Sequence, residues 1–179
     1  MRKIIAVGGV PGTGKTTLFR KFMENKTWEI VEPKKLLPAL YCSELDLYIL
    51  GKYEDGEIYA GTDRLSMAVQ PVAQEFVEGT TSNILFEGDR LTNSKFYNFL
   101  LKLPNTEVKF IILTTFKDIL QDRYTSRGSN QSEVFLKGRD TKIENITSNF
   151  EYMDTIIEFR NNTMQEQSMI LSYMREYLR

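Results

Sequence analysis

A glycine-rich segment near the amino terminus, Gly9-Val-Pro-Gly-Thr-Gly-Lys15-Thr16, satisfies the pattern G-x-x-x-x-G-K-[ST] at every specified position. Its glycines let backbone N–H groups turn inward around an anion, and a helix that begins there adds the partial positive charge of its first turn. Lys15 would then reach the β- and γ-phosphates of a nucleotide, and the Thr16 hydroxyl would bind Mg²⁺. An ordinary glycine-rich turn needs neither side chain. The segment therefore predicts a site for ATP and Mg²⁺, made by Gly9, Pro11, Gly12, Thr13, Gly14, Lys15, Thr16 and Thr17.

Acidic residues follow two of the predicted strands. Glu32 comes after the apolar segment 28–31, and Glu87 and Asp89 come after the apolar run that ends at Phe86. Ligands of parallel α/β sheets lie beyond the carboxyl ends of the strands, so these acids are expected near the phosphates. An apolar strand that ends in an acid is typical of a Walker B element, which holds Mg²⁺. The metal ligands are predicted to be Thr16, Glu87 and Asp89, although a solvated acidic turn would look the same in sequence.

A hydroxyl that receives a phosphoryl group benefits from a carboxylate that accepts its proton. The chain contains no histidine, which excludes Ser-His-Asp and Cys-His mechanisms as well as His-ligated metals. The candidates for the proton acceptor are therefore Glu32, Asp63, Glu87 and Asp89. Asp63 stands at the start of a predicted helix over 64–78 and could simply cap it. We favour Glu32 slightly, because it follows a strand, where the backbone position is well fixed, and because Glu32-Pro33 resembles the Glu-Pro of deoxynucleoside and thymidylate kinases.

Basic residues gather in the segment from Arg123 to Lys142, which carries five basic and two acidic residues on a chain of net charge −1. Gly128 and Gly138 interrupt residues 127–142, as in a mobile loop. We expect this lid segment to close over ATP and to bring Arg127 and Arg139 to the transferring phosphoryl group. A solvated basic loop is the simpler alternative.

The elements that must position these residues can be recognised from the apolar spacing. Short apolar runs alternate with segments of helical spacing, which predicts a parallel sheet covered on both faces. Residues 45–60 are expected to form a β-hairpin insert on the acceptor side, and Thr163 with Glu166 forms a capping box before the last helix. We therefore predict one α/β domain over residues 1–179, with three layers and a five-stranded, mainly parallel sheet. The predicted strands are 3–7, 28–31, 83–86, 107–113 and 156–159.

Composition excludes several other classes of protein. With 179 residues and 41% hydrophobic residues, the chain can bury a sizeable core. No apolar run approaches the roughly 18 residues of a membrane span. The single cysteine, Cys42, cannot form an intrachain disulfide or a Cys-rich zinc site, which favours the cytoplasm. The nearly even charge gives no general attraction to nucleic acid, although a local basic patch remains compatible with it.

These motifs together resemble the P-loop nucleoside and nucleotide kinase family over nearly the whole chain. The segment Val31-Glu32-Pro33 is similar to the Glu-Pro of deoxynucleoside and thymidylate kinases, in which the glutamate faces the acceptor. Glu87-Gly-Asp-Arg90 is similar to their acidic-Arg element, and Phe159-Arg-Asn-Asn162 stands where the family wraps the adenine. The resemblance implies that Arg123 and Asn162 bind ATP and that Glu32, Asp63, Arg64 and Arg90 bind the acceptor.

The stretch Gly61-Thr-Asp63-Arg64-Leu-Ser66 additionally resembles the acceptor-side Asp-Arg of phage polynucleotide kinases, and phage kinases that phosphorylate hydroxymethyluracil within DNA. Three functions therefore stay open. The first is transfer of the ATP γ-phosphoryl to a nucleoside or nucleotide, the second is transfer to a hydroxyl of DNA, and the third is NTP hydrolysis without a small acceptor. No membrane partner is expected, and a homodimer stays open.

Overall fold

The alternation of apolar residues along the first strand divides the core into two parts. In β1 (Arg2–Gly8), Ile4 and Ala6 face one side of the sheet, while Ile5 and Val7 face the other, because successive side chains of a strand alternate. All four side chains are fully buried. The computed structural model, which describes all residues 1–179, therefore has one hydrophobic core on each face of its sheet.

Seven strands form a single sheet in the order β2-β3-β4-β5-β1-β6-β7. Neighbouring strands from β4 to β7 in this order run parallel, whereas β3 is antiparallel to both β2 and β4. The predicted mainly parallel sheet is confirmed, but it has seven strands rather than five. Besides β1, the strands are β2 (Glu29–Lys34), β3 (Leu37–Cys42), β4 (Leu47–Leu50), β5 (Asn83–Glu87), β6 (Thr106–Thr114) and β7 (Ile156–Arg160).

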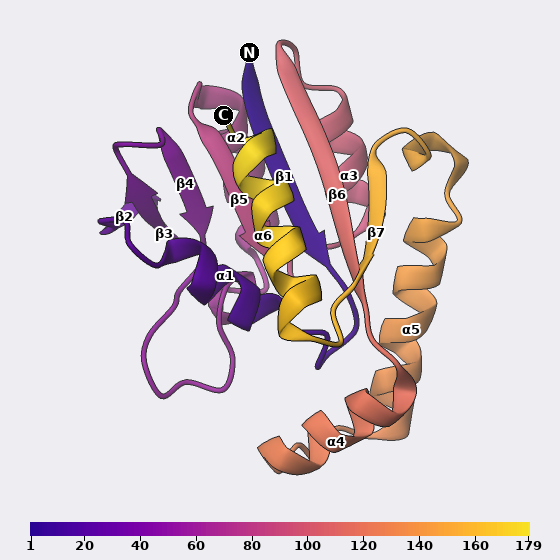
Figure 1. Cartoon of the computed structure of the whole chain (residues 1–179). Helices are drawn as coiled ribbons and strands as arrows, with labels where there is room; N and C mark the ends of the chain where they lie inside the picture. Colours follow the sequence, from indigo (N-terminus) through magenta and orange to yellow (C-terminus); the bar gives the residue numbers. More distant parts are fainter.

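Helices cover both faces of the sheet and complete the three predicted layers (Figure 1). On one face, α1 and α6 pack side by side over the central strands. On the other face lie α2, α3 and the end of α5. Figure 1 shows α4 beyond the carboxyl ends of the strands. The helices are α1 (Lys15–Met23), α2 (Val69–Gly79), α3 (Ser94–Leu101), α4 (Lys117–Arg127), α5 (Glu133–Thr147) and α6 (Met164–Tyr177), with short 3-10 helices η1 (Thr62–Arg64) and η2 (Phe150–Tyr152).

The predicted hairpin over 45–60 is wrong in its pairing. Its first half forms β4, which pairs with β3 on one edge and with β5 on the other. Because both edges of β4 are occupied, residues 57–60 have no strand to join. Residues 52–61 instead form a loop that is closed at its base by an isolated antiparallel bridge between Lys52 and Gly61. We call this segment the 52–61 loop.

The predicted lid over 127–142 is mostly helical rather than an irregular loop. Only residues 128–132 connect α4 to α5, and the left-handed Gly128 (φ 60°) caps the end of α4. Ser132 begins α5 by accepting a hydrogen bond from the backbone N–H of Phe135. The helix then continues through Gly138, even though a glycine costs about 1 kcal/mol relative to alanine in a helix interior. The segment after Ser132 is therefore a helix, capped at its start, in spite of the glycine in its interior.

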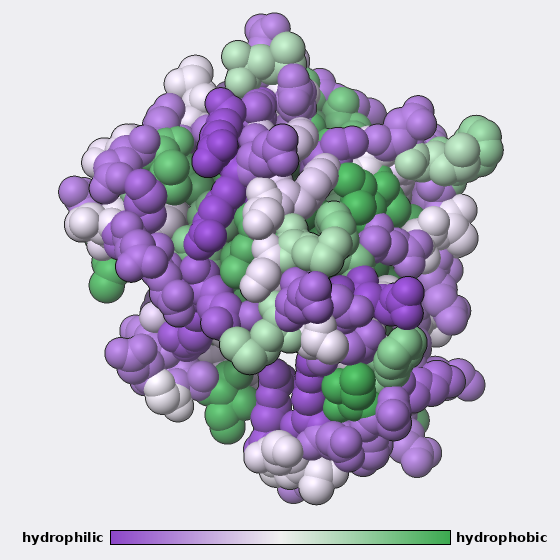
Figure 2. Space-filling model, viewed as in Figure 1, coloured by the Kyte–Doolittle hydropathy of each residue, from purple (hydrophilic) through white to green (hydrophobic).

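The last helix and the surface agree with the sequence. Thr163 and Glu166 form the predicted capping box at the start of α6. The face shown in Figure 2 is mostly hydrophilic, with its apolar side chains in separate small groups. No helix of the protein combines the length and the apolar character that a membrane crossing needs.

The close approach of Gly51 and Gly61 can be tested by mutation. A Cβ on Gly51 would lie 2.2 Å from the carbonyl carbon of Gly61, and Gly51 has φ +110°. We expect Gly51→Ala to lower the free energy of unfolding by about 2 kcal/mol or more, because left-handed strain adds to the clash. Chemical denaturation measures the change. Gly79→Ala is the control, because a Cβ there meets nothing within 4 Å; equal stability of the two variants would contradict the expectation.

Candidate active site

The glycine-rich segment forms a closed loop between β1 and α1 at the carboxyl edge of the sheet. The Lys15 ammonium donates to the carbonyl oxygens of Gly9 (2.7 Å) and Val10 (3.1 Å). It makes no ion pair, although Glu87, Asp63 and Asp89 lie close enough to favour its charge. Burial dominates and lowers the pKa of Lys15. A half-buried cation that contacts only carbonyl groups fits the binding of a phosphate group.

Side chains from α4 and from the end of β7 support this loop from behind. A Cβ on Gly12 (φ +85°) would lie 2.7 Å from the Tyr124 ring, and the Tyr124 hydroxyl donates to the carbonyl of Pro11 (2.6 Å). The amide of Asn161 donates to the carbonyl of Thr13 (2.8 Å). The loop is therefore held in shape before any nucleotide binds.

Two residues predicted to bind ATP have other contacts. The Arg123 guanidinium donates to the carbonyls of Gly12 (2.7 Å) and Asn161 (2.9 Å), so it fixes the loop. Asn162 accepts from the backbone N–H of Phe116 (2.9 Å) and does not line the cavity described below. Asn161, one residue earlier, is the asparagine that contacts the phosphate loop. The sequence pointed to Asn162 rather than Asn161 because it locates the end of a strand only to within a few residues.

The predicted Walker B acid, Glu87, lies beside Thr16 at the start of α1. Glu87 ends β5 and is 1% exposed. One of its oxygens, Oε1, accepts from the hydroxyls of Thr16 (3.2 Å) and Tyr53 (3.2 Å). Burial raises the pKa of Glu87 to about 7, although Lys15 acts in the opposite direction. Thr16 and Glu87 would hold Mg²⁺, and no group of three or more acidic, His or Cys side chains surrounds them. Such a sparse donor set fits Mg²⁺, which keeps waters and phosphate oxygens as ligands.

Asp89 does not fit its predicted role as a metal ligand. Its Oδ2 pairs with the Arg139 guanidinium (2.6 Å), and its Oδ1 pairs with the Lys142 ammonium (2.8 Å). Two cations from α5 therefore occupy both carboxylate oxygens. Asp89 does follow β5, as predicted, but the cations that occupy its oxygens come from a helix that is distant in sequence.

Asp63 lies in the cavity and is not the cap of a long helix. It belongs to η1, and α2 begins only at Val69. Its Oδ1 accepts from the backbone N–H of Asp89 (2.7 Å), whereas its Oδ2 has no hydrogen-bond partner in the protein. One oxygen is thus fixed by the turn after β5, and the other is available to a ligand.

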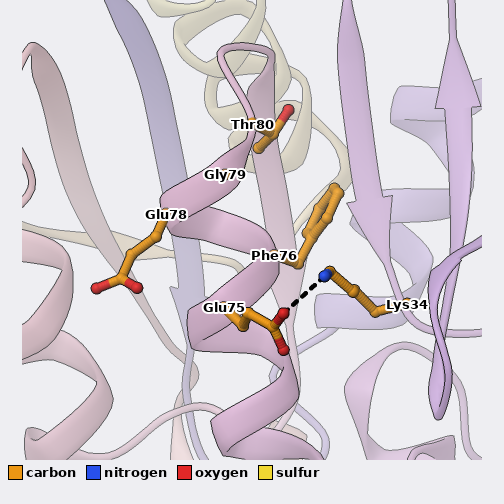
Figure 3. A pocket seen from close by; sticks show the side chains of 6 residues that line it. All are labelled: Lys34, Glu75, Phe76, Glu78, Gly79 and Thr80. Atoms are coloured by element: carbon orange, nitrogen blue, oxygen red, sulfur yellow. Dashed lines mark hydrogen bonds and ion pairs between the residues drawn. The ribbon is translucent and has the colours of Figure 1, made fainter.

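Glu32, the favoured proton acceptor, is not brought to the site. It is exposed on the edge strand β2, and β3 and β4 lie between β2 and β5. Lys34 of the same strand pairs with Glu75 of α2 (2.7 Å) in a separate, mostly polar cavity of about 590 Å³ (Figure 3). Lys34 and Glu75 neutralise each other, and Glu78 is the one further charged residue of the lining, so we assign no chemistry to that cavity.

The main cavity has a volume of about 910 Å³ and extends from the glycine-rich phosphate loop to the 52–61 loop and α5. Arg64 is not part of its lining, because the Arg64 guanidinium pairs with Glu54 (3.0 Å) and Glu57 (3.6 Å) of the 52–61 loop. Arg90 does line the cavity, and its Nε donates to the carbonyl of Leu65 (3.2 Å). The remaining lining residues that bear on chemistry are Lys15, Thr16, Ile58, Tyr59, Asp63, Glu87, Asp89, Arg127, Phe135 and Arg139.

This phosphate loop, the acid after β5 and the basic helix facing them define a P-loop fold of the kinase type. A family profile described as "AAA domain" matches residues 5–150, and the chain belongs to that family.

Two solved structures share the fold. A gluconokinase from Sinorhizobium meliloti 1021 has a TM-score of 0.52 and 14% identity, covering 99% of this chain and 97% of that one. A sugar kinase from Janibacter sp. HTCC2649 has a TM-score of 0.55 and 16% identity, covering 98% and 95%. At such identities the likeness concerns the fold alone. A search of curated protein sequences found no match.

Sequence reasoning missed Tyr53 and Tyr124 as parts of the site. Tyr53 follows β4, which runs parallel to β5. Both strands therefore end at the same edge of the sheet, and this pairing places Tyr53 near Glu87. The ring stacks on Phe19 of α1 (centroids 5.9 Å apart), and burial beside Glu87 raises the pKa of Tyr53 well above its ordinary value. The hydroxyl therefore stays protonated and donates to Glu87. Tyr124 carried no sequence signal, because its contact with Pro11 spans 113 positions.

The role of Lys15 can be separated from stability. We expect Lys15→Met to lower phosphoryl transfer by roughly 10²-fold or more, because the charge that contacts the phosphates is lost. The melting temperature of the ligand-free protein should stay equal or rise, since a half-buried cation without an anionic partner is removed. Lys21→Met on the same helix is the control. Retained activity in Lys15→Met would contradict the phosphate-binding assignment.

The raised pKa of Glu87 predicts a pH-dependent stability without ligands. A carboxyl whose pKa rises from 4.5 to about 7 on folding favours the folded state at low pH. That contribution is lost as the pH increases through about 7. Glu87→Gln should therefore be more stable than the wild type at pH 8, by about 3 kcal/mol at most. Urea unfolding at pH 5 and pH 8 measures the difference, with the exposed Glu78→Gln as control. A Glu87→Gln variant with no gain at pH 8 would contradict the assignment.

Proposed function

We propose that this protein is an ATP- and Mg²⁺-dependent kinase that transfers the γ-phosphoryl group to a nucleoside or nucleotide. The observation that carries the proposal is the meeting of Lys15, Thr16, Glu87 and Asp63 in one cavity with Arg127 and Arg139 opposite them. Phosphate binding alone would need only the loop. The additional free carboxylate and the arginines support transfer to an acceptor.

Each of these side chains has a role in the proposed reaction. The phosphate loop and Lys15 bind the phosphates, and Thr16 with Glu87 binds Mg²⁺, which when bound neutralises phosphate charge. The free Oδ2 of Asp63 accepts the proton of the acceptor hydroxyl, while Oδ1 stays on the Asp89 N–H. Arg127 and Arg139 stabilise the charge that develops on the transferring group.

The lining of the acceptor side favours a planar acceptor over a sugar acid. Tyr59 and Ile58 of the 52–61 loop and Phe135 of α5 line the cavity mouth. The Arg139 guanidinium lies over the Phe135 ring, 4.5 Å from its centroid, and fixes the ring. Aromatic and apolar side chains stack on a nucleobase, whereas a sugar acid offers them no flat surface.

One observation favours DNA as a second candidate acceptor. Ile58 and Tyr59, which line the cavity, are 75% and 57% exposed, and Met67, which contacts Arg90 of the lining, is 80% exposed. A free nucleoside inside the cavity would leave much of this apolar surface in water, whereas a base carried by a polymer would cover it. The 52–61 loop itself is acidic, and Arg64 and Arg20 neutralise it.

A panel of acceptors with labelled ATP distinguishes the alternatives. Transfer to nucleosides or nucleotides supports the first proposal, transfer to oligonucleotides the second, and release of free phosphate alone indicates an NTPase. Gluconate serves as the comparison acceptor, given the structural neighbours. Transfer to gluconate alone would contradict a base-bearing acceptor.

The proton acceptor can be identified in the same assay. Asp63→Asn keeps an oxygen for the Asp89 N–H but cannot take a proton, so we expect kcat to fall by roughly 10²-fold or more. Glu32→Gln should leave kcat unchanged, because Glu32 lies outside the cavity. An Asp63→Asn variant with full kcat would mean that the acceptor is already ionised, as a nucleotide phosphate is.

A further inference from the structure

The turn after β5 joins three elements of the site through one residue, Asp89. Its carboxylate binds Arg139 (2.6 Å) and Lys142 (2.8 Å) of α5, and its carbonyl oxygen accepts a further bond from Lys142 (3.1 Å). Its backbone N–H donates to Oδ1 of Asp63 in η1 (2.7 Å). The helix with the basic residues and the candidate proton acceptor are therefore connected through a single turn.

The amino-terminal part of α5 has few other attachments. Ile146 is the only buried residue of the helix, and it lies near the carboxyl end. Val134 is 82% exposed in the first turn. Because few apolar contacts hold this part of α5, its position over the cavity depends strongly on the ion pairs with Asp89.

The two cations on Asp89 are not equivalent. Arg139 lines the cavity, but Lys142 does not. Lys142 makes two bonds to Asp89, whereas Arg139 makes one ion pair. Lys142 can therefore keep α5 in place while the Arg139 guanidinium turns toward the phosphoryl group.

We propose that Asp89 is a positioning residue rather than a metal ligand. Held by Lys142, it seats α5 so that Arg139 reaches the cavity, and its N–H fixes Asp63 against the acceptor. This inference rests on the proposed kinase function for its catalytic part. The seating of α5 is a property of the ligand-free protein and is testable without that function.

The catalytic part is tested with Lys142→Gln, Asp89→Asn and the double variant. We expect each single variant to lower kcat about tenfold, with the KM values and the Mg²⁺ requirement changed less than twofold. The double variant should be no slower than Asp89→Asn, because Lys142 acts through Asp89. Lys142→Arg should keep nearly the wild-type kcat, because arginine can retain the ion pair with Asp89. Lys137→Gln is the control: it lies on the same helix, makes no ion pair and should have the wild-type kcat. A raised Mg²⁺ requirement in Asp89→Asn, or additive losses in the double variant, would overturn the proposal.

The seating of α5 is tested by hydrogen exchange of the ligand-free protein. The amides of residues 133–142 should exchange faster in Lys142→Gln than in the wild type, and Lys137→Gln should leave them unchanged. Unchanged exchange in Lys142→Gln would overturn the seating, even if the wild type transfers to no acceptor and the proposed function itself fails. Faster exchange with a wild-type kcat would overturn the link to catalysis.

Discussion

The site depends on two ionisable side chains, the half-buried Lys15 and the buried Glu87, that do not form an ion pair with each other. Removing charges from water is expensive, and neither Lys15 nor Glu87 has an ionic partner in contact. Lys15 is held by loop carbonyls, and Glu87 by the hydroxyls of Thr16 and Tyr53. The hydrophobic cores on both faces of the sheet supply the stability that tolerates this arrangement. A bound phosphate group would supply an anionic partner for Lys15, and a bound cation would supply a partner for Glu87.

Two segments enclose this charged centre from opposite sides. The 52–61 loop is closed by the Lys52–Gly61 bridge and is held by Arg20 and Arg64. The helix α5 is held through Arg139 and Lys142, in its middle part, by Asp89 in the turn that follows β5. Both segments are held in part by partly exposed ion pairs, which are individually weak. The enclosing segments are therefore the parts of the site most easily displaced, whereas the phosphate loop is fixed by buried hydrogen bonds.

The strands β2, β3 and β4 explain why a sequence resemblance misplaced one residue. Glu32 and Pro33 match a motif in which the glutamate of the second strand faces the acceptor. Here β3 and β4 occupy the positions between that strand and β5. The cavity is instead lined by residues that follow β4, among them Asp63, and Glu32 does not line it.

The sequence by itself determined the alternation of strands and helices, the phosphate loop, the acid at the end of β5 and the capping box of α6. These features are local, since each depends on residues within a few positions of one another. The strand count, the partner of β4 and the contacts of Asp89, Asn161 and Tyr53 were decided only by the tertiary structure. The physical reason is that pairing of strand edges and neutralisation of buried charges join residues that are distant along the chain: Lys142 reaches Asp89 across 53 positions.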